Sequence, residues 1–413
     1  MQTQLYFATN RGHEGADRFA PDRYGPRFSS DGMENLRFGR VRFDVDEAKV
    51  LELLARRREH TGAGDGEALQ DYFARCVKSS QRIECYRESI PDPKVNETAQ
   101  GAAVKLGSQA MFADLQADMQ QGRDLLVLVH GFNVSWEEAV ATAAAFEAVI
   151  NRHDPQLDAG QPFQPVRVLL FTWPSDGSAL PWASYKSDRA DARGTSGALG
   201  RALLKLRDQL HLLGREVRQK SVEVQQLRAR MADRPAAEVE RAVAQLEATQ
   251  LCGQKLHLLA HSMGNYVLQN ALSRVYEFSP GNQLPRIFDH VFLCAPDVDD
   301  DALEEGGGLA RVHQVAQAVA VYHNPGDTAL KISDYTKGNP DRLGQRGAAR
   351  PQALHQKVYQ VDCAPLVTGL TQHSYYTNGR IARDIRLALQ GQTPLARGLR
   401  ATGLAPNCWS FVR

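Results

Sequence analysis

Short apolar runs recur along the chain from residue 124 onward, each bounded by residues that form turns. Leu125–Val129 is continuously apolar, as in a strand buried on both faces, and an Ala-rich helical pattern follows from about Ser135 to Ile150. Similar runs, mostly followed by helical pattern, lie at 166–172, 255–259, 290–294, 316–322 and 358–362. This alternation predicts right-handed βαβ crossovers and therefore an α/β fold with a doubly wound, mainly parallel sheet.

The first 120 residues have a weaker pattern. Strands are predicted at 5–10 and 36–44, and the alternation of apolar and basic residues in the second suggests edge strands. The Gly- and Pro-rich stretch 12–32 between them is predicted to be a long loop. Residues 46–120 show helical patches at 50–58 and 111–119, and their role stays open.

An insertion is predicted between the runs at 166–172 and 255–259, because about 80 residues separate them and a crossover usually needs a few tens. Apolar residues follow a heptad spacing at Leu203, Leu206, Leu210, Leu213, Val217, Val224, Leu227 and Met231. Pro235 interrupts this pattern, which resumes at Val239, so a helical hairpin over about 197–250 is expected. It is either an elongated crossover packed on its own return arm, a lid, or a dimerisation arm through 199–231. The α/β core is then expected at residues 121–390, with an N-terminal region at residues 1–120 and a C-terminal tail at residues 391–413.

The charge balance excludes binding through a whole-chain field. Lys and Arg number 49 against 48 Asp and Glu, so neither nucleic acid nor an anionic membrane is expected as a partner. No run of about 18 apolar residues and no signal-peptide pattern occurs. The six cysteines are scattered without a C-x-x-C pair, which predicts buried thiols, a reducing cytoplasm and no zinc site.

The strongest chemical signal is the segment Leu256–Leu272. A buried strand runs through a small-x-Ser-x-Gly turn directly into a helix, the context of a nucleophile elbow with Ser262 as the nucleophile. The turn requires small residues two positions before and after the serine, and Ala260 and Gly264 occupy them. Ala260 departs from the usual glycine. The alternative is an ordinary serine that caps a helix.

A second signal is the sequence His130-Gly-Phe-Asn133 at the end of the apolar run 125–129. In this architecture an oxyanion hole takes one backbone N–H from such a loop and one from the residue after the nucleophile. Phe132 and Met263 are the candidates. Alternatively, Gly131 only marks a turn.

The third signal is the order of the remaining residues. An acid after a later strand and a histidine after the last strand complete the order Ser, acid, His. Asp327 and His373 occupy these positions, and Asp297 is a rival acid whose alternative role is a helix cap. Asp327 is favoured because its strand neighbours the strand that leads to His373.

Other residues have weaker claims on a catalytic or binding role. The remaining histidines considered are His257, His261 and His323. Trp173, Trp182 and Tyr185, with Pro174 and Pro181, follow a strand end and are either an acyl pocket or local packing.

With these residues in place, the chain resembles a mainly bacterial branch of the α/β-hydrolase superfamily that is of unknown function. The resemblance is carried by Val127–Val134, Phe171–Gly177, Tyr185–Asp188, His257–Asn265, Leu293–Val298, Gln372–Tyr375, Tyr6–Arg11 and Phe38–Val41. It implies a serine hydrolase of carboxylic esters with Ser262, Asp327 and His373 at the triad positions.

The leading hypothesis is therefore an esterase or lipase-like enzyme that acts on a small-molecule or lipid ester and needs no metal or organic cofactor. Amide hydrolysis and acyl transfer use the same groups and stay open. A non-catalytic scaffold that assembles through the heptad helix, and a secreted effector that attacks membrane lipids, are the alternatives.

Overall fold

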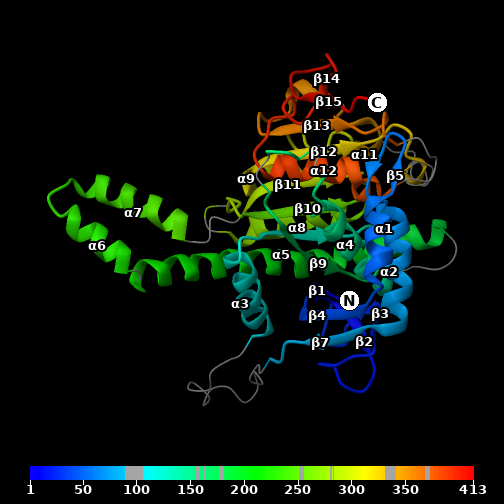
Figure 1. The fold of residues 1–413 in the computed structure, drawn as a ribbon, viewed down its shortest axis with the longest axis horizontal. Helices are drawn as coiled ribbons and strands as arrows, with labels where there is room; N and C mark the ends of the chain where they lie inside the picture. The colour runs from blue at the N-terminus through cyan, green and yellow to red at the C-terminus, as the bar shows by residue number, and fades with distance from the viewer. Residues whose placement is uncertain are drawn as a thin grey trace.

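The structure is a computed structural model in which the chain is built around one large sheet (Figure 1). The described residues are 1–88, 106–154, 158–160, 163–175, 181–220, 222–250, 255–279, 281, 283–330, 341–367 and 373–413.

The sheet has 11 strands within the described part of the chain. In spatial order they are β14 (Arg400–Ala401), β15 (Cys408–Ser410), β13 (Val358–Asp362), β12 (Ala316–His323), β11 (Phe288–Cys294), β10 (Leu256–His261), β8 (Asp124–Val129), β9 (Val166–Thr172), β1 (Gln2–Thr9), β4 (Arg37–Asp44) and β7 (Arg82–Cys85). All neighbours from β15 to β1 pair in parallel. The prediction of a doubly wound, mainly parallel α/β sheet is confirmed.

The winding direction reverses between β8 and β10. The chain leaves β8 for β9 on one side, whereas β10, β11, β12 and β13 follow one another on the other side. Loops from the two halves therefore separate at the carboxyl ends of β8 and β10, where ligands bind in such sheets.

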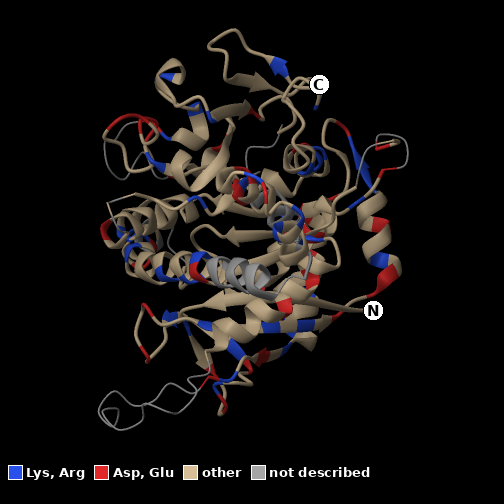
Figure 2. Cartoon of the chain, turned by 90° about the vertical axis from the view of Figure 1, so that its left-hand side faces the viewer, with Lys and Arg blue, Asp and Glu red and all other residues tan. Residues whose placement is uncertain are grey.

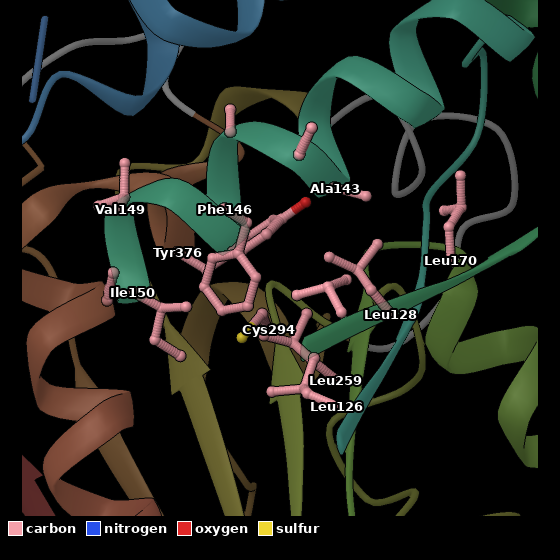
Figure 3. Packing of buried hydrophobic residues seen from close by; sticks show 14 of the residues in the cluster. Leu126, Leu128, Ala143, Phe146, Val149, Ile150, Leu170, Leu259, Cys294 and Tyr376 are labelled. Atoms are coloured by element: carbon pink, nitrogen blue, oxygen red, sulfur yellow. The ribbon is translucent and has the colours of Figure 1, made fainter. Parts of the chain in front are cut away.

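Helices cover both faces of the sheet. One face carries α2 (Gly66–Ser80), α4 (Trp136–Ile150) and α12 (Gly379–Leu389), and the other carries α8 (Gly264–Phe278) and the first half of α5 (Pro181–Lys220). Because side chains alternate along a strand, Leu126 and Leu128 of β8 pack under Phe146 of α4 (Figure 3). Leu125 and Val127 enter the core on the opposite face.

The N-terminal region differs from the expectation in two respects. The strands expected at the edge are interior, because β1 lies between β9 and β4 and the short strand β7 pairs with β4. The stretch 12–32 is also not one loop, since β2 (Arg11–Glu14) and β3 (Arg23–Phe28) form an antiparallel pair. The pattern within one segment does not show which strands it will pair with. β1 and β4 pair with strands from other segments, and β2 pairs with β3 across a turn.

The helical patches in this region lie largely in helices. They correspond to α1 (Glu47–Ala55) and α3 (Gly107–Gln120), but the first patch extends too far, since Arg57–Arg58 form β5, which pairs with β6 (Gly62–Ala63). Neither this small pair nor α2 had been expected. The remaining short elements are α9 (Val312–Val315), α11 (Leu343–Arg346), η2 (Pro351–Ala353) and η3 (Tyr375–Thr377).

The insertion forms a projecting helical arm (Figure 1). It consists of the second half of α5, α6 (Val222–Arg230) and α7 (Ala236–Gln250). Leu203 and Leu206 of the heptad pattern pack in the core beside α8. In the arm, Arg228 of α6 forms an ion pair with Glu240 of α7 at 2.9 Å. Whether the arm acts as a lid or a dimer contact stays a prediction.

The surface, the cysteines and the C-terminal segment add four observations. Acidic and basic residues are interspersed over the face in Figure 2, and none of the described helices is long and apolar enough to cross a bilayer. The five described cysteines are free thiols, four of them buried, while Cys252 lies outside the described residues. The segment expected as a tail supplies β14 and β15 to the sheet.

Candidate active site

Ser262 occupies a strained turn at the carboxyl end of β10. Its φ is 53°, in the left-handed region that a side chain rarely adopts. Its amide donates to the Cys294 carbonyl oxygen at 3.0 Å, which fixes the turn against β11. A Cβ at Gly264 would lie 2.6 Å from the carbonyl oxygens of Val129 and His130, so a glycine is required where α8 crosses the end of β8.

Asp327 and His373 meet beside this turn. Asp327 follows β12, His373 precedes η3, and the His373 Nδ1 lies 2.7 Å from the Asp327 Oδ2. Because a carboxylate only accepts, the imidazole donates from Nδ1 and keeps a lone pair on Nε2. The second carboxylate oxygen of Asp327 accepts from the Ala329 amide at 3.0 Å. The structure thus brings together the acid and the histidine favoured by strand order.

Two atoms at the site have no hydrogen-bond partner among the described residues, although both are buried. They are the Ser262 Oγ and the His373 Nε2. The residue before Ser262 connects the two segments, because the ring of His261 lies 4.7 Å from that of His373, centroid to centroid. Buried polar atoms without partners are uncommon in proteins, and a catalytic role is one of the explanations for them.

The rival acid has other partners. Asp297 is buried, accepts from the Tyr185 hydroxyl at 2.9 Å, and pairs with the fully buried Arg342, whose Nε lies 3.4 Å from its Oδ1. Its backbone amide donates to the Ser262 carbonyl oxygen at 3.2 Å. Asp297 therefore supports the serine turn through its backbone, and its side chain anchors Tyr185 and Arg342.

The loop after β8 lies directly over the serine. A Cβ at Gly131 would come within 2.8 Å of the Ser262 Cβ and 3.2 Å of its Oγ, so only glycine allows this approach. Neither the Phe132 nor the Met263 amide donates to another described residue. The next residue, Asn133, has a φ of 53°, and its amide donates to Asp188 of α5 at 2.8 Å.

A buried arginine that the sequence did not reveal holds this loop from below. Arg11 of β2 is completely buried, and its Nη2 donates to the Val134 carbonyl oxygen at 2.6 Å. Its Nε donates to the Thr172 hydroxyl at 3.0 Å, and that hydroxyl lies 2.9 Å from the His130 Nε2. The segment Tyr6–Arg11 belongs to the resemblance described above, and a basic residue at the end of an apolar strand was the available signal.

Two further histidines near the site are kept neutral. Burial and the neighbouring Arg11 guanidinium lower the pKa of His130 to about 3. Burial, with a smaller contribution from His373, lowers the pKa of His261 well below its ordinary value. Both rings are therefore uncharged at neutral pH.

The remaining residues with weaker claims lie elsewhere or serve packing. His257 lies 3.4 Å from Asp124 at the amino end of β8, far along the strand from the serine turn. Burial lowers the pKa of His323.

The aromatic residues expected as an acyl pocket are packing residues where they are described. Trp173 is fully buried and stacks on His130 with ring centroids 5.5 Å apart. Tyr185 is buried edge-on against Phe132. The side chain of Trp182 lies outside the described residues.

The described residues contain no group of three or more His, Cys, Asp or Glu side chains arranged to hold a metal ion. The geometry that is present consists of a serine in a strand-to-helix elbow, an Asp–His pair and two open amides.

This fold and this arrangement are those of an α/β hydrolase. A family model described as an alpha/beta hydrolase of unknown function (DUF900) matches residues 108–229 and 228–385. The chain belongs to that family, as the sequence resemblance had indicated. No curated protein matches the chain.

Proposed function

We propose that this protein is a serine hydrolase that cleaves carboxylic esters through Ser262, His373 and Asp327. The observation that carries the proposal is the 2.7 Å contact between Asp327 and the His373 Nδ1, which leaves a buried Nε2 without a partner. Ser262 supports it, because its hydroxyl is also unpartnered and its backbone is strained as in a nucleophile elbow.

In the proposed first step, the Ser262 Oγ forms a bond to the ester carbonyl carbon while the His373 Nε2 takes the hydroxyl proton. Asp327 holds the imidazole in the required tautomer and stabilises the imidazolium. The negative carbonyl oxygen accepts from the Phe132 and Met263 amides, and each such donor typically contributes about 3 kcal/mol to the transition state.

The tetrahedral intermediate then collapses. The bond to the leaving alcohol breaks, and His373 returns the proton to that alcohol's oxygen, which leaves an acyl group on Ser262. Water then forms a bond to the acyl carbon while the His373 Nε2 takes one of its protons; the bond to the Ser262 Oγ breaks, and His373 returns that proton to the Oγ, which releases the carboxylic acid. All protons are accounted for, and no metal or organic cofactor takes part in any step.

Hydrolysis of amides and transfer to acceptors other than water would use the same groups. Esters are the substrates proposed, and the preferred acyl chain length is a matter for experiment. The scaffold and the lipid-attacking effector remain its competitors. A cytoplasmic location and self-association through the helical arm are separate predictions that this chemistry does not require.

The test combines labelling with a series of p-nitrophenyl esters of increasing acyl length, for wild type and Ser262→Ala. A fluorophosphonate probe should label the wild type and not the variant, and ester hydrolysis should fall by several orders of magnitude in the variant. A preference for short chains indicates an esterase, whereas activity rising past about eight carbons indicates a lipid substrate. A folded wild type that the probe does not label would refute catalysis through Ser262 and favour a scaffold.

A further inference from the structure

A cavity of about 240 Å³ opens beside His373. The loop of His373 forms one wall, and the segment 58–71, from the N-terminal region whose role the sequence left open, forms the other. Apart from two glycines and the imidazole of His373, the described lining residues are charged, hydroxyl-bearing or amide-bearing, and none of them is aliphatic. The cavity therefore offers polar groups to a ligand.

The two walls are fixed tightly to each other. A Cβ at Gly66 would clash with the Thr377 carbonyl oxygen, and a Cβ at Gly379 would clash with that of Ala63. The Gly379 amide also donates to the Gly64 carbonyl oxygen at 3.2 Å. The first turn of α2 is thus held at a constant position relative to the loop that carries His373.

The side chains of the wall formed by residues 58–71 differ in their hydrogen-bond and ion-pair partners. The Arg58 guanidinium is occupied by Asp65 at 2.9 Å and by Glu67 at 3.2 Å. The side chains of the half-buried Gln70 and the exposed Asp71 form no hydrogen bond or ion pair with any described residue. A carboxylate can only accept, and an amide oxygen also accepts, so these two groups favour a ligand that carries O–H or N–H donors.

The position of the cavity indicates which part of an ester it receives. In the proposed mechanism His373 hands its proton to the oxygen of the leaving alcohol, so that alcohol must lie next to His373. The acyl group is bonded to Ser262 and faces the Phe132 and Met263 amides, and none of these three lines the cavity. A cavity on the histidine side fits the alcohol.

The volume is compatible with a small alcohol. The cavity is open to solvent on one side, and its 240 Å³ is ample for several water molecules. A polyol of three or four carbons fits this space.

We propose that the cavity is a leaving-group subsite for a small hydroxylated alcohol, with Gln70 and Asp71 as its hydrogen-bond acceptors. The inference rests on the proposed function and specifies its substrate class: esters of small polyols, preferred over esters of alkyl alcohols.

The experiment compares two esters of one acyl group, chosen as the best chain in the p-nitrophenyl series. The 2,3-dihydroxypropyl and propyl esters have the same carbon skeleton in the alcohol, so kcat/KM for the first divided by that for the second measures recognition of the hydroxyls. Gln70→Leu/Asp71→Leu should lower this ratio about tenfold, the effect of losing two hydrogen bonds.

The matched control is Lys78→Leu, an exposed position on the same helix that does not line the cavity, and its ratio should equal that of wild type. If the double variant does not fold, Asp71→Ala alone should lower the ratio about threefold. A ratio that stays within twofold of wild type, in an enzyme that still depends on Ser262, overturns the subsite and leaves the hydrolase standing. Equal hydrolysis by Ser262→Ala, or no ester hydrolysis at all, would instead refute the proposed function itself.

Discussion

Replacing Asp327 by Asn should test whether Asp327 is the acid of the proposed triad, because Asn has almost the same shape as Asp. One carboxylate oxygen of Asp327 accepts from the Ala329 amide at 3.0 Å and the other from the His373 Nδ1 at 2.7 Å. Asn can keep only its single oxygen on the Ala329 amide, which places its NH₂ group against Nδ1. The imidazole must then accept at Nδ1 and carry its proton on Nε2, the tautomer that cannot take a proton from serine.

The expected loss in turnover is 10³- to 10⁴-fold, which corresponds to about 4 to 5.5 kcal/mol of transition-state stabilisation. Stability should change little, because the hydrogen bond to the Ala329 amide is retained. The carboxylate is almost fully buried, so water cannot take its place beside the imidazole.

Asp297→Asn is the matched control, because it makes the same chemical change at the rival position. This variant should mainly lower the free energy of unfolding, by about 1 to 3 kcal/mol, because the buried Arg342 loses a charged partner at 3.4 Å. Turnover should fall much less than in Asp327→Asn.

Hydrolysis of a p-nitrophenyl ester and urea unfolding, measured on both variants, separate the two effects. A larger loss of turnover in Asp297→Asn would refute the assignment of the acid while leaving Ser262 and His373 in place.

Three further variants test the serine elbow, the loop after β8 and a buried histidine at the far end of the sheet. Gly264→Ala should abolish activity and lower the unfolding midpoint in urea, because its Cβ would lie 2.6 Å from the Val129 carbonyl oxygen; full activity would contradict the elbow. Arg11→Lys should lower kcat 10- to 100-fold with a smaller change in KM, since the loop loses the 2.6 Å bond to Val134 and one oxyanion donor shifts; unchanged kcat would contradict the positioning role. Burial lowers the pKa of His290 to about 3, so below about pH 6.5 this histidine is protonated in the unfolded chain but not in the folded one, and stability falls as pH drops from there. The free energy of unfolding of wild type should therefore fall by about 2 kcal/mol more than that of His290→Phe between pH 7.5 and pH 5, measured by urea unfolding. Parallel pH profiles of the two proteins would contradict this.

The features of the site that the sequence predicts are those with a local or topological signature. A serine between a buried strand and a helix, with small residues on both sides, identifies the elbow from neighbouring residues alone. Asp327 was favoured over Asp297 because consecutive strands of a doubly wound sheet lie side by side, and β12 does pair with β13.

The features that the sequence does not predict depend on contacts between distant segments. Arg11 and the Val134 carbonyl oxygen are 123 positions apart, and no period or spacing connects them. The helix α2, by contrast, has a local signature, because Leu69, Phe73 and Val77 are buried at four-residue spacing after the cap residue Asp65. Its contact with the His373 loop depends on two glycines that look like ordinary turn residues in the sequence.

The buried contact of Arg11 has a consequence for how the protein is divided. The family match begins at residue 108, and a fragment cut there would contain Ser262, Asp327, His373 and both candidate amides. It would lack β1, which pairs in parallel with β9, so that β9 would become an open edge liable to pair with other chains. It would also lack the guanidinium under the loop 130–134 and one wall of the polar cavity. Such a fragment would keep every residue of the proposed triad and lose the contacts that hold their surroundings in place.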